Sequence, residues 1–326
     1  MNFREFGWNG LNFEIPEDAR FTRFAGDAKG GSFVFESDEY LIEGKWEPIP
    51  KKRQSISVIA TTLIEKMSEK YKKRGRISGQ SIKVLERKDA RVFTHDALFM
   101  IVKEQVDERF YLWYCDESNR IMIMRFIFKI FDETSKKIIR KVIESLICHK
   151  EGPNVWSLLN FRFEAPKDFY LTEAKIAVGR AHFVLTAKKV SSFSEMISTL
   201  IVDYYSLANV VFKDTYNNIG EWFRKNYERD LFRQLKKRKI KFISEEPKKL
   251  STHDLLIKKG ISRSGFSWRS TTLYTNLSWY CQESNRIYTV TMTSSLSKPF
   301  FLKRKTSEIE HTRHLESLLS SFKCHL

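Results

Sequence analysis

The alternation of hydrophobic and polar positions divides the chain into segments with helical or strand periodicity. Apolar residues at helical spacing predict helices over 55–73 and 134–148. Alternating or β-rich stretches predict strands at 11–16, 32–36, 39–48, 81–87, 92–103, 109–115 and 120–130. Beyond residue 150 the same plan repeats, with its first long helix near 218–238. A sheet packed with two helices in each half predicts an α+β layer.

An internal duplication organises the chain. The segment Trp-Tyr-Cys-Asp-Glu-Ser-Asn-Arg-Ile that begins at Trp113 returns at Trp279 with one difference, a Gln in place of the Asp. The Thr-His-Asp of residues 94–96 returns at 252–254, and the Cys-His pair at 148–149 returns at 324–325. A repeat of this length sets the domain organisation. We therefore expect two homologous domains, 1–150 and 151–326.

The distance between matching positions grows along the chain. It is 150 residues between Pro16 and Pro166, and 176 residues between His149 and His325. We assign the additional residues of the second copy to its loops, where insertions are best tolerated. The predicted fold class is α+β, with two tandem copies of a mostly antiparallel sheet, each packed with two helices.

Two resemblances to known families rest on these features. The order of a strand, a proline, more strands, a helix, antiparallel strands and a last helix ending at Ser321-Phe322 resembles the PsbP-like α/β/α sandwich. The Trp-Tyr-Cys-x-Glu-Ser-Asn-Arg segment with a terminal Cys-His resembles a family of uncharacterised archaeal domains. The first resemblance implies a PsbP-like sandwich for each copy and a binding or assembly role, and the second implies no known activity. Neither supplies catalytic residues, because a fold does not fix a function.

All four cysteines and four of the seven histidines occupy repeated positions, which makes them the candidate site. If the hairpin over 92–115 is centred near Val106, His95 faces Glu117 and Cys115 lies on the same face. The strand 120–130 then runs away and the following helix returns, so Cys148 and His149 are expected beside Cys115. The resulting clusters comprise His95, Cys115, Cys148 and His149 in the first copy and His253, Cys281, Cys324 and His325 in the second.

Three interpretations of these clusters stay open. The first is a disulfide from Cys115 to Cys148, and from Cys281 to Cys324, although such bonds are rare in the cytosol. The second is zinc bound by two thiolates and two imidazoles. Against it, adjacent residues on a regular helix, as expected for the Cys-His pairs, point about 100° apart. The third is a set of buried free thiols.

A thiol- or metal-dependent enzyme is a further alternative. Cys115 near His95 has the residue types of a thiol hydrolase. However, a cysteine on a strand lacks the helix N-terminus that would depress its pKa, and duplication of every member suits a structural role. Common enzyme signatures, including Gly-rich phosphate loops and the His-Glu-x-x-His motif, are absent from the sequence. The remaining histidines are interpreted as ordinary: His182 on a strand, and His311 and His314 on an exposed helix face.

The charge adds a candidate partner. The chain has 57 Lys and Arg against 40 Asp and Glu, a net charge of +17. A Lys-rich solvated surface is one explanation. A nucleic-acid surface is the other, because basic runs close the first long helix of each copy. The residues that would contact phosphates are Lys72, Lys73, Arg74, Arg76, Lys236, Lys237, Arg238, Lys239 and Lys241.

The sequence therefore favours a non-enzymatic binding or assembly module with an unknown protein partner, each copy being closed by its Cys/His cluster. The alternatives are a nucleic-acid-binding protein and the thiol- or metal-dependent enzyme. The only cofactor considered is zinc. No apolar run approaches the roughly 18 residues of a membrane span. The N-terminal residues lack the plan of a signal peptide, so a soluble, cytoplasmic protein is expected.

Overall fold

The computed structural model describes residues 1–326 except 28, 74–81, 104–105, 215, 217, 235–239, 251–252, 266–267, 300–306 and 326. The chain forms two compact units, Met1–Leu159 and Asn160–Leu326. None of the described helices combines the length and the apolar character needed to cross a membrane.

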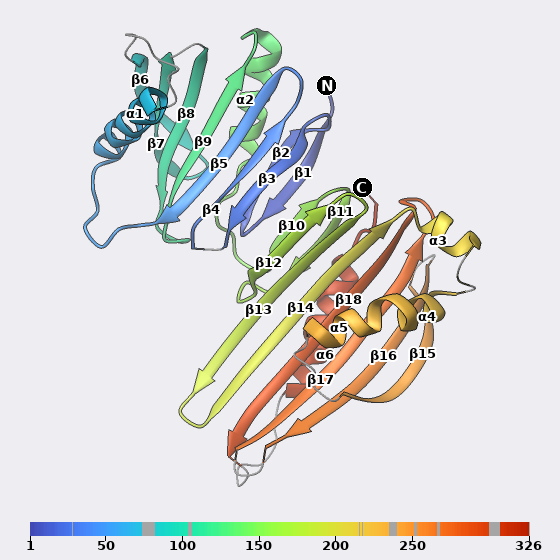
Figure 1. Ribbon diagram of the computed structural model, residues 1–326. Coiled ribbons are helices and arrows are strands. Elements are labelled where there is room, and N and C mark those ends of the chain that lie inside the picture. The colour runs from blue at the N-terminus through green and yellow to red at the C-terminus, as the bar shows by residue number, and fades with distance from the viewer. Residues whose placement is uncertain are drawn as a thin grey trace. The chain divides into compact units, whose positions relative to one another are not determined.

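The first unit is built on a seven-stranded antiparallel sheet (Figure 1). In spatial order its strands are β3 (Arg20–Gly26), β4 (Gly31–Glu36), β5 (Tyr40–Pro48), β9 (Arg120–Phe128), β8 (Asp107–Cys115), β7 (His95–Lys103) and β6 (Lys83–Val92). A smaller sheet contains β2 (Leu11–Pro16), β1 (Phe3–Trp8) and β10 (Asn154–Leu158). Burial alternates along β2 and β5, where every second side chain is buried, as the period of two requires.

Two helices complete the described part of the first unit. Helix α1 (Ile56–Lys73) packs its apolar stripe against β7 and β8, where Ala60 lies with Met100 and Leu112. Helix α2 (Glu133–Ser145) begins with a capping box in which Asp132 accepts a hydrogen bond from the Ser135 backbone N–H at 2.8 Å. It packs against β2 through a buried stripe of apolar side chains. Both helices lie where the helical spacing predicts them, but α2 ends three residues earlier than expected.

The second unit repeats this strand order (Figure 1). Its sheet runs β12 (Tyr170–Ala177), β13 (Arg180–Ser191), β14 (Ser194–Ser206), β18 (Arg286–Pro299), β17 (Trp268–Cys281), β16 (His253–Ser264) and β15 (Lys241–Leu250). Strand β11 (Phe161–Ala165) precedes it. The helices are α3 (Ala208–Asp214), α4 (Ile219–Trp222), the π-helical turn η1 (Phe223–Tyr227), α5 (Glu228–Gln234) and α6 (Ser307–Ser321). The run from α4 to α5 lies across one face of the sheet and α6 across the other (Figure 1).

The predicted α+β class is wrong. Among the described residues, strands far outnumber helices, so the protein is mainly β and not a sandwich with two helices per copy. The additional residues of the second copy largely lengthen strands instead of loops. The β17 and β18 strands have 14 residues each, whereas their counterparts β8 and β9 have nine. The added segments are rich in Ser and Thr, and Thr favours strands, but these residues carry no apolar alternation that would announce a strand.

Candidate metal centres

Each unit brings two cysteines and two histidines together. In the first, one nitrogen or sulfur atom from each of His95, Cys115, Cys148 and His149 lies within 4.8 Å of the others, and the repeated residues His253, Cys281, Cys324 and His325 do the same in the second. All four cysteines are buried and form no disulfide. The residues predicted as two clusters are therefore assembled by the fold.

Neighbouring strands position the first two side chains. In the β7–β8 ladder Ala97 pairs with Trp113, and continuing that register places His95 opposite Cys115. The register in the second unit, where Leu255 pairs with Trp279, places His253 opposite Cys281 in the same way. The predicted hairpin centre was wrong by one residue, so each histidine faces the cysteine instead of the glutamate. The face is unchanged, because side chains alternate with a period of two.

The segment that follows the last helix places the other two side chains, Cys148 and His149. After α2 ends at Ser145, the chain becomes extended at Leu146, and Ile147 exchanges two backbone hydrogen bonds with Asn12 of β2, at 2.9 and 2.7 Å. Cys148 and His149 follow directly after this bridge. The helical geometry that argued against zinc is therefore wrong, because both residues lie beyond the helix.

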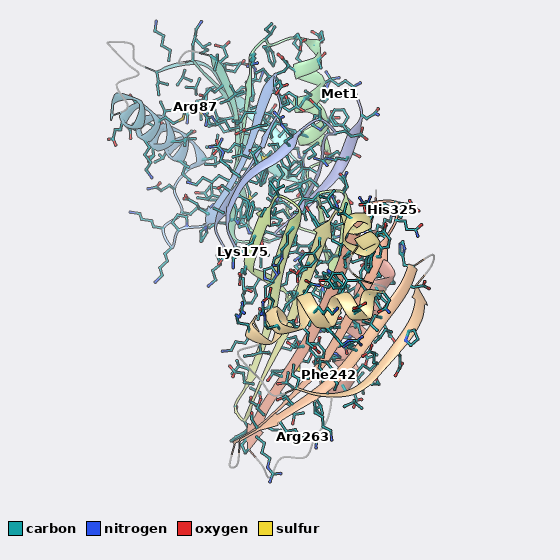
Figure 2. The ribbon with its side chains drawn as sticks, turned by 45° about the vertical axis from the view of Figure 1, so that its right-hand side comes forward. Met1, Arg87, Lys175, Phe242, Arg263 and His325 are labelled. Atoms are coloured by element: carbon teal, nitrogen blue, oxygen red, sulfur yellow. The ribbon has the colours of Figure 1, made fainter. Side chains whose placement is uncertain are left out.

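In the second unit a similar short bridge follows α6. Lys323 exchanges backbone hydrogen bonds with Arg162 of β11 at 2.9 and 2.8 Å, and Cys324 and His325 follow. His325, labelled in Figure 2, ends this segment. Both clusters are thus assembled by a strand pair on one side and a short antiparallel bridge on the other.

In the first cluster, three ligand atoms lie close to a single nitrogen atom, Nδ1 of His149. His149 Nδ1 lies 3.3 Å from His95 Nε2, 3.3 Å from Cys115 Sγ and 3.6 Å from Cys148 Sγ. An imidazole nitrogen offers a single in-plane lone pair or a single N–H, so one hydrogen bond cannot account for three such contacts. A common ion between the four atoms can.

The second cluster brings the same four residue types together with a different set of close contacts. His325 Nδ1 lies 3.5 Å from Cys281 Sγ and 3.4 Å from Cys324 Sγ, and His253 Nε2 lies 3.1 Å from Cys324 Sγ. Zinc held by two thiolates and two imidazoles separates its ligand atoms by about 3.4 Å for a nitrogen pair and about 3.6 Å for a sulfur–nitrogen pair, given Zn–S of about 2.3 Å and Zn–N of about 2.0–2.1 Å. Five of these six distances lie within about 0.3 Å of the tetrahedral edges, and the His253–Cys324 distance is shorter.

A carboxylate stands behind one histidine of each cluster. Glu117 Oε1 lies 3.7 Å from His149 Nε2, and Glu283 Oε2 lies 2.9 Å from His325 Nε2. In each case this is the ring nitrogen that does not face the sulfurs. Carboxylate–histidine–metal arrangements of this kind fix the ring orientation of a ligand. The Glu of the repeated motif therefore has a role at the site.

Buried hydrogen-bond donors lie near the sulfurs. The indole nitrogens of Trp113 and Trp279 and the hydroxyls of Ser118 and Ser284 are buried without a hydrogen bond of good geometry. They lie close enough to the cysteines to lower thiol pKa values: Trp113 acts on Cys148 and Ser118 on Cys115. Buried donors need acceptors, and thiolates would supply them. These contacts account for the Trp and Ser positions of the repeated motif.

The two thiols of each cluster differ in acidity. Hydrogen bonding by Cys148 and then by Ser118 lowers the pKa of Cys115 to about 5 against the effect of burial. The hydrogen bond to Cys115 and burial raise the pKa of Cys148. In the second cluster burial alone would raise the pKa of Cys281, but hydrogen bonds led by Ser284 outweigh it and lower that pKa. Burial and then Cys281 raise the pKa of Cys324 to about 12. These contacts favour the thiolate of Cys115 in the first cluster and shift the pKa of Cys281 in the same direction.

The predicted phosphate-binding residues are not brought together by the described part of the chain. Lys241 lies exposed at the start of β15. The side chains of Lys72 and Lys73, at the end of α1, and the whole of Arg74, Arg76, Lys236, Lys237, Arg238 and Lys239 lie outside the described residues. The nucleic-acid interpretation therefore stays a prediction.

The structure also gives hydrogen-bond partners to two of the three histidines that were expected to be ordinary, His311 and His182. His311 and His314 are buried, so the predicted exposed helix face is wrong. The two ring nitrogens of His311 form hydrogen bonds of 2.9 Å with the hydroxyl groups of Thr275 and Ser294, which lie on the sheet packed against α6. The helical spacing of apolar residues misses this face because it is lined by Ser and Thr.

On the opposite face of the second sheet, His182 Nδ1 lies 2.7 Å from Oδ1 of Asp203, which is 0% exposed. Tyr227, from the π-helical turn, donates to the other oxygen of Asp203 at 2.8 Å. Burial followed by the Asp203 charge raises the pKa of Tyr227 well above its usual value. The network is sealed under the helices, which suits a structural role. No sequence signal announces it, because its members are more than 20 residues apart.

The fold and the two clusters define a mainly-β tandem-repeat protein with two Cys/His groups able to bind a metal. No protein-family model matches the chain, and no curated protein matches it. Among solved structures it is similar to the apo immunity protein TplEi of T6SS from Pseudomonas aeruginosa, with a TM-score of 0.29 and 10% identity over 98% of this chain and 96% of that chain. The same immunity protein complexed with "L" peptide gives a TM-score of 0.24 and 12% identity over 99% and 97%. Likeness at this level carries no conclusion about function.

Proposed function

We propose that this chain is a zinc-binding protein in which one structural centre closes each repeat, and that its role is non-enzymatic binding of a protein partner. The observation that carries the metal assignment is the convergence of three ligand atoms within 3.6 Å of His149 Nδ1. The repeated cluster supports it independently, because the second copy reproduces both the ligand types and the nitrogen atoms that face inward.

Zinc is the metal that this donor set favours. Two thiolates and two imidazoles at tetrahedral spacing are the ligands of structural zinc sites, whereas calcium and magnesium prefer oxygen ligands. The pKa of Cys115, lowered to about 5, supplies a thiolate to the first centre at neutral pH, and the pKa of Cys281 is shifted in the same direction. A bound cation would deprotonate the second thiol, since metal binding releases the protons of its ligands.

A structural role fits the ligand set better than catalysis. Catalytic zinc sites use three protein ligands and keep the fourth position for water or substrate, whereas each cluster here offers four. The ligands also come from distant parts of each repeat, so an ion would join the segment after α2 or α6 to the sheet. Such cross-links contribute directly to folding free energy.

Native mass spectrometry of freshly purified protein, compared with its denatured, non-reduced mass, tests the proposal. We expect two zinc ions per chain and four reduced thiols. Cys281→Ala should remove one zinc and leave the first centre loaded, which serves as the internal control. A denatured mass that is lower by four hydrogens, in protein without metal, would show that the four cysteines form two disulfides and would overturn the proposal. Four free thiols that take up no zinc when the ion is added would also overturn the proposal.

A further inference from the structure

A cavity of about 680 Å³ lies in the second unit, where β16 begins and β17 ends. The α3 region contributes Phe212 and Tyr216 to its wall, and the sheet contributes Tyr280. His253 and Glu283, which belong to the second metal centre and its supporting carboxylate, line it together with Asp254. Its volume falls in the range of ligand-binding pockets, about 300–1,000 Å³.

The lining of this cavity differs in charge from the rest of the protein. The chain carries a net charge of +17, yet the described lining residues include the carboxylates of Asp254 and Glu283 and no lysine or arginine. Three aromatic rings complete the wall. Carboxylates and aromatic faces together favour a cation with an apolar stem. Lys225 lies 5.6 Å from the Tyr216 ring centroid, and Glu221 pairs with its ammonium group at 2.7 Å.

At the equivalent position of the first repeat, an arginine of the chain itself packs on the equivalent tyrosine. Tyr114 is the repeat equivalent of Tyr280, and the guanidinium carbon of Arg53 lies 4.2 Å from its ring centroid. Arg53 Nη1 also donates to Asp116 Oδ1 at 2.8 Å. The chain therefore places one of its own guanidinium groups between a tyrosine ring and a carboxylate beside the first metal centre.

In the second repeat that internal cation is replaced. Phe212 packs on Tyr280 with ring centroids 5.3 Å apart, and Gln282 takes the place of Asp116. The carboxylates of Asp254 and Glu283 are retained as the equivalents of Asp96 and Glu117. The second repeat thus keeps acidic and aromatic groups around a space that no arginine among its described residues lines.

We propose that this cavity binds a guanidinium cation, presented by an arginine side chain of a partner protein. Asp254 and Glu283 would accept its N–H hydrogen bonds, and the apolar stem would lie against the aromatic wall. This inference deepens the proposed binding role but does not depend on which metal occupies the centre. Its failure and that of the zinc assignment are separable, because metal content and cation binding are measured independently.

The test uses the full chain with its metal content measured, and acetyl-arginine amide as the probe in saturation-transfer NMR. We expect binding of this probe and none of acetyl-citrulline amide, which has nearly the same shape but no charge. Asp254→Asn should weaken binding about fivefold, the upper range for one exposed charge pair. Asp96→Asn, the matched change in the first repeat, should leave binding unchanged.

Three outcomes would overturn the inference. Equal binding of the citrulline probe would remove the requirement for a cation. Unchanged binding by Asp254→Asn, in protein that retains its metal, would place the arginine probe elsewhere. Butylguanidinium, which has the same single charge and an apolar stem but no peptide groups, binding more tightly than acetyl-arginine amide would assign the cavity to a small-molecule cation instead of a protein side chain.

Discussion

Glu283 Oε2 lies 2.9 Å from His325 Nε2, while the other ring nitrogen of His325 faces both cysteines of the second centre. One side chain is therefore held between a carboxylate and the ligand cluster. The equivalent pair in the first centre, Glu117 and His149, is separated by 3.7 Å. The two centres share one design but differ in how tightly the supporting carboxylate holds the histidine.

The first prediction concerns this carboxylate. Glu283→Gln should lower the zinc affinity of the second centre about 10- to 100-fold, the usual cost of losing such a partner. The matched change Glu117→Gln should cost less, because its contact is longer. Competition with a chromophoric chelator measures both affinities. An equal loss of zinc affinity in the two variants would contradict the idea that the carboxylate–histidine distance sets the contribution of each glutamate.

The second prediction is the order of zinc release. The side chain of His325 is 45% exposed and that of His149 is 21% exposed, so a chelator should reach the second centre first. Native mass spectra taken during chelation should pass through a one-zinc species. In Cys281→Ala that early phase should be absent, whereas Cys115→Ala should retain it. Loss of both ions in a single step would argue against separate centres.

The third prediction concerns the buried network beneath the π-helical turn. Tyr227→Phe removes a hydroxyl that donates to Asp203, leaving one oxygen of a buried carboxylate without that partner. We expect the free energy of unfolding to fall by about 1–3 kcal/mol. Urea unfolding of the zinc-loaded protein measures the change. Tyr170→Phe, at an exposed tyrosine, is the control and should alter stability little.

The fourth prediction is a pH dependence from His311. Burial, and then the charge of His314, lowers the pKa of His311 to about 4. Protonation is therefore easier in the unfolded chain, whose histidine pKa is about 6.5. This contribution to stability is fully present above about pH 6.5 and decreases as the pH falls toward 4.

Replacing His311 with Gln tests this dependence, because Gln can still hydrogen-bond Thr275 and Ser294 but does not titrate. The variant should show a shallower loss of stability between pH 6.5 and 4 than the parent protein, measured as unfolding free energy in urea. The difference across this window should be on the order of 3 kcal/mol. Parallel curves for the two proteins would show that His311 is not held neutral.

The fifth prediction concerns the close pairing of β1 with β10. A Cβ added at Gly7 would lie 2.6 Å from the backbone oxygen of Val155, closer than real contacts allow. Gly7→Ala should therefore expose the β10 amides to hydrogen exchange and destabilise the small sheet by about 1–3 kcal/mol. Gly30→Ala is the control, since its added Cβ would meet its nearest neighbour at an ordinary 3.6 Å. Equal protection in both variants would contradict the steric argument.

The sequence by itself determined the duplication, the helices that became α1 and α2, and the membership of both Cys/His clusters. These followed from local periodicity and from the recurrence of rare residue types, which require no knowledge of packing. It also placed His95 and Cys115 on one face of a hairpin, because a slip of the turn centre by one residue leaves side chains on the same face.

Tertiary structure decided the rest. The mainly-β class depends on strands such as β17 and β18, whose Ser and Thr positions are buried by pairing and by helices from elsewhere in the chain. The convergence of Cys148 and His149 on one point depends on the bridge from Ile147 to Asn12, a contact across 135 residues. The burial of His311 and the Asp203 network likewise depend on which strands become neighbours. Contacts between residues far apart in the chain leave no periodic trace in the sequence, and only the folded sheet order reveals them.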